Sequence, residues 1–128
     1  MEQAIKQHGA FSWNELMTSD VEGAKKFYSE LLGWTMYPIP ECEAGYTMAK
    51  SKDMDVGGIM GIPDEFSNMP PAWSSYITVD NVDEYAVLAK QLGAKIILEP
   101  QDIPNVGRFT VISDPQGAIL SLITYNNK

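Results

Sequence analysis

The chain has 128 residues, of which 45% are hydrophobic and 20% charged, and its formal net charge is −8 at pH 7. A chain of this length and composition can fold as a single globular domain with its own core. Nine lysine and arginine residues against 17 aspartate and glutamate residues argue against binding to nucleic acid or to an anionic membrane. The charge favours a neutral or cationic ligand instead.

No stretch of the sequence indicates export or membrane insertion. The first ten residues lack the basic and apolar segments of a secretory signal, and no apolar run approaches the roughly 20 residues of a membrane span. Cys42 is the single cysteine, so it cannot form an internal disulfide, and its acidic neighbours disfavour a reactive thiolate. We therefore expect a soluble, cytoplasmic protein.

The first half of the chain predicts a strand, a helix and three further strands. Residues 11–18 have the length of a strand, and residues 19–33 carry an apolar stripe at helical spacing. Ser19 or Asp20 can cap the start of this helix, and Gly33 can end it. The stripe consists of Val21, Ala24, Phe27, Tyr28, Leu31 and Leu32. Short runs of strand-forming residues follow at 34–39, 46–50 and 56–62.

The second half repeats this order of elements. Residues 73–79 predict a strand and residues 80–93 a helix. Three strands are then expected at 95–100, 107–113 and 118–125. Trp13 and Trp73, like Thr18 and Thr78, recur about sixty residues apart, which is typical of an internal duplication.

Two short segments define how these elements are connected. Residues 63–72 are a proline-rich connector between the halves, and residues 114–117 (DPQG) have the composition of a type I turn between antiparallel strands. We predict an α+β fold in which two tandem βαβββ modules form one curled mixed sheet around a cleft, where a ligand would bind. The tail is expected at 1–10 and the single domain at 11–124, with module one at 11–62 and module two at 73–125.

Three stretches of the sequence resemble one known family. They are SDVEGAKKFYSELLGW, AWSSYITVDNVDEYAVLAKQLGAKII and GRFTVISDPQGAILSLI. They resemble the vicinal oxygen chelate superfamily, which includes glyoxalase I, extradiol dioxygenases and bleomycin-resistance proteins, and the resemblance covers residues 11–124. It implies the fold predicted above and a homodimer, with exchange of modules between subunits left open. It does not choose among the superfamily's several chemistries and simple binding.

The resemblance also indicates where a metal would be held. In metal-dependent members the ligands come from the first and last strand of each module. These four positions fall on Trp13, Met60, Ser74 and Ser121, none of which suits a divalent metal. A two-histidine iron site is excluded by count, because His8 is the single histidine. We therefore expect no metal and no other cofactor, with an oxygen-only Mg²⁺ or Mn²⁺ site as the alternative.

Glu15 is the candidate catalytic residue. Side chains alternate along a strand, so Trp13, Glu15 and Met17 share one face, and the resemblance implies that this face looks into the cleft. A carboxylate there suits a general base, or an anchor for a ligand cation or hydroxyl. The alternative is a carboxylate at the solvated rim or one tied to a structural partner.

The predicted ligand-binding residues fall into three groups. The aromatic and thioether side chains are Trp13, Met17, Tyr46, Met48, Met60, Trp73 and Tyr76, each of which can equally belong to the core. Ser74 and Ser121 would supply polar lining. Arg108 would hold a ligand carboxylate, or else pair with acidic neighbours at the rim.

We interpret the chain as a metal-independent small-molecule-binding protein similar to the bleomycin-resistance branch. Its ligand would be apolar or aromatic with a polar or cationic handle. One alternative is a lyase, isomerase or hydroxylase-like enzyme with Glu15 as general base, with or without an oxygen-ligated metal. Another is an interaction module whose cleft is filled by its own side chains.

Overall fold

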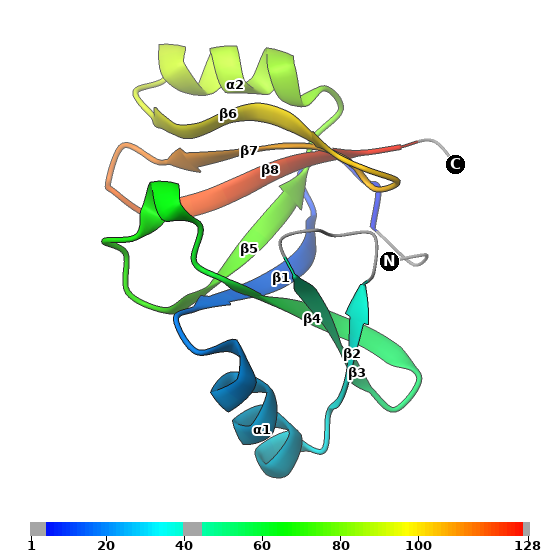
Figure 1. Cartoon of the computed structure of the whole chain (residues 1–128). Coiled ribbons are helices and arrows are strands. Elements are labelled where there is room, and N and C mark those ends of the chain that lie inside the picture. Colours follow the sequence, from blue (N-terminus) through cyan, green and yellow to red (C-terminus); the bar gives the residue numbers. More distant parts are fainter. Residues whose placement is uncertain (1–4, 40–44, 127–128) are drawn as a thin grey trace. The chain divides into compact units, whose positions relative to one another are not determined.

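The computed structural model describes residues 5–39 and 45–126. Their elements are β1 (Phe11–Thr18), α1 (Val21–Leu32), β2 (Thr35–Ile39), β3 (Tyr46–Ser51), β4 (Met54–Gly61), the short helix η1 (Asp64–Phe66), β5 (Ala72–Thr78), α2 (Val82–Gln91), β6 (Lys95–Ile103), β7 (Gly107–Ser113) and β8 (Ile119–Tyr125) (Figure 1). The predicted α+β class is confirmed, and the order β-α-β-β-β occurs twice. Cys42 lies outside the described residues.

The chain divides into two compact units. One consists of residues 14–73, and the other, which we call the terminal unit, consists of residues 1–13 and 74–128. In the 14–73 unit the strand order is β2-β3-β4-β1, and in the terminal unit it is β6-β7-β8-β5. The first and last strand of each half pair in parallel, and the other pairs are antiparallel.

Helix α1 starts and stops where the sequence predicts. The Asp20 carboxylate accepts a hydrogen bond from the Gly23 backbone N–H at 2.9 Å, and Gly33 ends the helix with a φ of 74°. Glycine adopts this left-handed conformation without steric cost. Pro38 in β2 is also accommodated, because β2 is the outermost strand of the β2-β3-β4-β1 order.

Asp20→Ala is expected to destabilise the protein by about 1 kcal/mol, because it leaves the first helical N–H groups without a capping oxygen. Ser19→Ala is the matched control, since Ser19 is exposed and Asp20 supplies the cap. Urea unfolding measures both. Equal losses in the two variants would contradict the assignment of the cap to Asp20.

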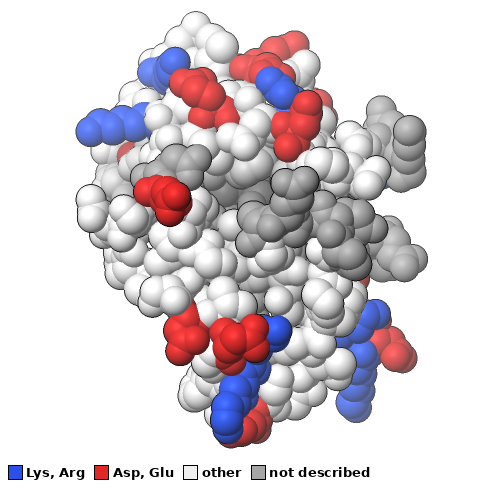
Figure 2. Space-filling view, viewed as in Figure 1, with Lys and Arg blue, Asp and Glu red and all other residues white. Residues whose placement is uncertain are grey.

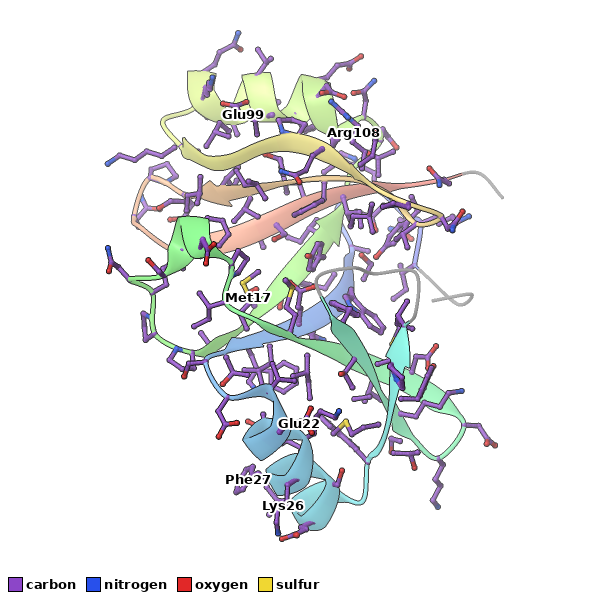
Figure 3. The ribbon with its side chains drawn as sticks, viewed as in Figure 1. Met17, Glu22, Lys26, Phe27, Glu99 and Arg108 are labelled. Atoms are coloured by element: carbon purple, nitrogen blue, oxygen red, sulfur yellow. The ribbon has the colours of Figure 1, made fainter. Side chains whose placement is uncertain are left out.

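The apolar stripe of α1 is wider than the face by which the helix packs. No described side chain of α1 is fully buried, and Phe27, Leu31 and Leu32 are more than half exposed. Phe27 and Lys26 project from the outer side of the helix (Figure 3). The helix instead contacts its unit through its inner side, where Tyr28 stacks on Trp34 at 5.6 Å.

The core of the terminal unit lies between α2 and its sheet (Figure 1). Val82 of α2 packs with Val79, Ile112 and Leu122. The predicted turn between β7 and β8 is confirmed: the Gly117 N–H donates to the Asp114 carbonyl at 2.8 Å, and the two strands pair in antiparallel fashion.

Gly107 marks the tightest approach between β7 and β8. It pairs with Tyr125 and is buried. A Cβ at this position would overlap the backbone carbonyl oxygen of Thr124 and lie 2.9 Å from Tyr125 Cα. Only a residue without a side chain fits here.

The described residues before β1, which the sequence assigned to a tail, are bonded to the end of β5. The Gly9 N–H donates to the Thr78 carbonyl at 2.7 Å, and the Thr78 hydroxyl donates to the Ile5 carbonyl at 2.6 Å. Lys6 Nζ donates to the Asn126 carbonyl at 3.2 Å, which ties the two ends of the described chain together. These residues are ordered because the end of a strand offers them hydrogen-bonding groups.

Charged side chains of both signs gather over α1 and over α2 in the view of Figure 2. On α1 they form the pairs Lys25–Glu22 and Lys26–Glu30. No helix among the described residues is long and apolar enough to cross a membrane.

Candidate functional site

Glu15 lies on β1 and is only 4% exposed. Its register partner on β4 is Gly58, and the partner of Gly58 on β3 is Met48. Register partners on neighbouring strands point to the same face of a sheet. Glu15, Gly58 and Met48 therefore form one row across three strands, and the register partners Met17 and Met60 lie beside it in the next row.

Helix α1 covers the opposite face of this sheet. Gly61, the register partner of Thr18 on that face, has the Val21 side chain at the start of α1 at 4.0 Å from its Cβ position. The Met17 side chain lies on the other side of β1 (Figure 3). We call the side that carries Glu15 and Met17 the Glu15 face.

Tyr46 reaches across the Glu15 face to the row of Glu15. It lies two residues before Met48 on β3, so its side chain starts on the same face. A Cβ at Gly58 would overlap the hydroxyl oxygen and Cζ of Tyr46. The phenol therefore lies directly over the Gly58 backbone, in the row whose members on the two neighbouring strands are Met48 and Glu15.

A second group of polar side chains lies at the β2 end of the row that Glu15, Gly58 and Met48 form. Tyr37 is the register partner of Met48, and its hydroxyl donates to Asp55 at 2.8 Å. Lys50 Nζ lies 3.7 Å from the same carboxylate and 5.6 Å from the Tyr37 ring centre. Burial raises the pKa of Asp55, but the Tyr37 hydrogen bond and nearby positive charge, including Lys50, outweigh it and leave that pKa below its ordinary value. Sequence analysis missed this group, because only the strand register brings its members together.

Three predicted site residues come together in the terminal unit. Tyr76 and Ser121 are register partners and are each 4% exposed. Trp13 packs against the cluster that contains Tyr76 and Tyr125. Ser74 lies two residues before Tyr76 on β5 and is half-buried. Their predicted contact with a ligand remains a prediction.

Two predicted site residues lie elsewhere. Trp73 lies at 3.4 Å from the Cβ position of Gly57, which is on the α1 side of the sheet, and its Nε1 donates to the Tyr28 hydroxyl at 3.1 Å.

Arg108 donates to Asp83 at 2.9 and 3.1 Å and to Asp102 at 3.2 Å. The hydrogen bond from Arg108 lowers the pKa of Asp83 below its ordinary value. Arg108 thus pairs with acidic neighbours, which is the alternative that the sequence suggested to holding a ligand carboxylate.

Tyr125 forms a buried polar contact in the terminal unit. Its hydroxyl lies 2.9 Å from the Ser12 hydroxyl. Burial raises the pKa of Tyr125 above its ordinary value, although the hydrogen bond with Ser12 opposes this shift.

Tyr125 is therefore expected to make the protein sensitive to alkali. Because its pKa is higher in the folded than in the unfolded chain, its stabilising contribution is complete below the unfolded pKa of about 10 and is lost as the pH rises through the folded pKa. Urea unfolding at about pH 8 and about pH 11 should show a smaller alkaline loss for Tyr125→Phe than for the wild type. An identical loss in both proteins would contradict the prediction.

The four residues that the resemblance assigns to metal positions are poor ligands for a divalent metal. Met60 offers a thioether, Trp13 an indole, and Ser74 and Ser121 hydroxyls, none of which is a strong ligand for such an ion. Within residues 5–39 and 45–126, no group of three or more His, Cys, Asp or Glu side chains is arranged to hold a metal. Metal independence remains a prediction.

Comparisons with known proteins agree on one family. A model of the glyoxalase/bleomycin resistance protein/dioxygenase superfamily matches residues 10–122. "Putative glyoxylase CFP32" of Mycobacterium tuberculosis is 41% identical over 93% of this chain and 45% of that protein. "Anthracycline biosynthesis protein DnrV" of Streptomyces peucetius is 28% identical over 89% of this chain and 46% of that protein. The chain thus spans about half the length of these relatives.

Solved structures share the fold at low sequence identity. Methylmalonyl-CoA epimerase from Mycobacterium tuberculosis has a TM-score of 0.63 and 14% identity, over 92% of this chain and 88% of that chain. A variant of homoprotocatechuate 2,3-dioxygenase from B. fuscum has a TM-score of 0.63 and 18% identity, over 97% of this chain and 34% of that chain.

Proposed function

Because the chain belongs to the glyoxalase/bleomycin resistance protein/dioxygenase superfamily, we propose that it binds a small organic molecule on the Glu15 face. The observation that carries the proposal is a carboxylate with 4% exposure on a sheet face that also bears Met17, Met48 and Met60. A carboxylate can hold a cationic or hydrogen-bond-donating group of a ligand. Methionine side chains adapt to irregular apolar shapes.

This combination fits a ligand with an apolar or aromatic body and a polar or cationic handle. The methionines would contact the body, and Glu15 would hold the handle. Binding requires no metal in this proposal, since the four family ligand positions carry residues that do not suit one. The protein would act as a homodimer, as the family resemblance implies.

Native mass spectrometry of protein purified without chelator tests the proposal. We expect a metal-free dimer carrying an organic adduct, and we expect Glu15→Gln to lose the adduct because it removes the charge that holds the handle. Glu22→Gln is the matched control, since Glu22 lies on α1, where its side chain is 84% exposed (Figure 3). A stoichiometric divalent ion would overturn metal independence, and an adduct that survives in Glu15→Gln would remove Glu15 from the site.

The buried Glu15 also supports a second function, an isomerase, lyase or hydroxylase-like enzyme with this carboxylate as general base. A base shielded from water suits proton abstraction next to a carbonyl group. Turnover that disappears in Glu15→Gln while ligand affinity persists would favour the enzyme. Unchanged turnover in that variant would exclude Glu15 as the base.

A further inference from the structure

The outer side of helix α1 exposes large apolar side chains. Phe27 is 55% exposed and Leu31 is 61% exposed. Leu31 follows Phe27 by one helical turn, so the two side chains are neighbours on the helix surface. Phe27 points outward from the helix (Figure 3). Single exposed apolar residues are common, but apolar residues that lie together at the surface mark an interaction site.

Aromatic contacts extend this surface beyond the helix. The Phe27 ring meets the Tyr28 ring edge-on with their centres 4.9 Å apart, and Tyr28 meets Trp73 in the same manner at 5.5 Å. Trp73 is itself exposed. We call Phe27, Tyr28, Leu31 and Trp73 the α1 patch. Tyrosine and tryptophan are enriched among the residues that contribute most of the binding energy at protein interfaces.

The charges beside the α1 patch cancel each other. Helix α1 carries two glutamates and two lysines, which are Glu22, Lys25, Lys26 and Glu30. The whole chain, in contrast, has a formal net charge of −8. A net charge far from zero opposes the association of identical copies. This repulsion is weakest where local charges of both signs balance, as they do on α1.

Helix α2 lacks this balance, although it also exposes apolar side chains such as Val87. Its charged residues are Asp83, Glu84 and Lys90, which leave an excess of one negative charge. Arg108 pairs with Asp83 but is shared with Asp102, so it does not remove the excess. Two copies that met through α2 would bring like charges together, and the charge pattern therefore favours α1.

Lys26 and Glu30 make the α1 patch complementary to a second copy of itself. They form an exposed ion pair one turn apart on the helix. A twofold axis perpendicular to α1 would place the same patch on both copies, with the two helices antiparallel. Lys26 of each copy would then lie toward Glu30 of the other, while Phe27 and Leu31 would meet near the axis.

We propose that the α1 patch is the surface through which two copies of this chain associate, with their α1 helices antiparallel. The inference rests on the proposed function only for the homodimer, and it adds the surface that forms it. Helix α1 covers the sheet face opposite to the Glu15 face, so association through the α1 patch does not depend on a ligand.

Sedimentation equilibrium of the purified chain tests this surface. We expect the wild type to be a dimer at micromolar concentration. Leu31→Lys should raise the dissociation constant of the dimer at least about a hundredfold, because it places a charge in the apolar contact. Val87→Lys is the matched control, since Val87 is 57% exposed on α2, and it should leave the dissociation constant unchanged. Urea unfolding checks that both variants remain folded.

Charge reversal tests the direction of the two helices. Lys26→Glu leaves two negative side chains beside the patch and Glu30→Lys leaves two positive ones, so each variant alone should be monomeric. Mixed in equal amounts, the two variants should form a heterodimer, because opposite charges then meet between the copies. Both variants lose the same pair within the helix, so that loss cannot explain a difference between separate and mixed samples.

The outcomes distinguish this inference from ligand binding. A monomeric wild type would overturn the inference, and so would a dimer that Leu31→Lys leaves intact. Loss of the dimer in Val87→Lys alone would place the contact on α2 instead. Variants that remain monomeric on mixing would overturn the antiparallel arrangement. In native mass spectrometry, a monomer that carries an organic adduct would overturn the dimer and leave small-molecule binding intact.

Discussion

Gly107→Ala is expected to destabilise the protein by about 3 kcal/mol, among the largest effects of any single methyl group in the chain. The added Cβ would overlap the Thr124 carbonyl oxygen and approach Tyr125 Cα at 2.9 Å. Both are backbone atoms of the paired strand β8, so the overlap can be relieved only by separating β7 from β8. Urea unfolding measures the loss of stability.

Gly61→Ala is the matched control for this experiment. Gly61 also lies in a strand, but a Cβ there would have its nearest neighbours, Thr18 O and Val21 Cγ2, at 4.0 Å. This is ordinary van der Waals contact, so the change in the free energy of unfolding should stay within about 0.5 kcal/mol. A Gly107→Ala protein as stable as Gly61→Ala would contradict the close approach of β7 and β8.

The second large effect is the coupling between Gly58 and Tyr46. Gly58→Ala alone should cost about 2 kcal/mol, because the Tyr46 phenol must leave its position over the β4 backbone. In a Tyr46→Ala background the same substitution should cost less than about 0.5 kcal/mol, because the space is then free. A double-mutant cycle by urea unfolding gives the coupling energy.

A coupling energy near zero would show that the phenol does not lie over Gly58. The sign of the coupling energy also matters. Gly58→Ala and Tyr46→Ala together should cost less than the sum of their separate effects, because the overlap of the added Cβ with the phenol exists only while Tyr46 is present. Pairing Gly61→Ala with Tyr46→Ala is the control cycle, and these two substitutions should be additive.

Local patterns in the sequence account for most of the secondary structure. The strand expected at 11–18 has those bounds in the structure, and Asp20 and Gly33 limit α1 as their capping chemistry predicts. The turn at 114–117 joins β7 to β8 as its Asp, Pro and Gly indicate. These features depend on neighbours within a few residues, so one sequence suffices to predict them.

The burial of individual side chains on α1 could not be predicted in the same way. Hydrophobic spacing places Phe27 and Leu31 on the same stripe as Tyr28, yet Phe27 is 55% and Leu31 is 61% exposed. Spacing identifies an apolar side of a helix, but the width of the contact depends on what packs against it.

The candidate site was predicted only in part, because its geometry depends on strand register. Alternation along β1 correctly grouped Glu15 with Met17, but sequence separation gives no sign that Gly58 lies beside Glu15 or that Tyr46 leans over Gly58. A glycine in a strand is a signal that another group approaches closely. That signal was available in VGGIMGI, and only the register reveals which group approaches.

The hydrogen bond between Lys6 and the Asn126 carbonyl has a consequence for engineering the topology of the chain. Since both ends of the described chain meet in the terminal unit, a short peptide could join them with little strain. New ends could then be opened at Lys52, in the exposed turn between β3 and β4. A circularly permuted form of residues 5–126 should keep every strand pairing within each of the two units.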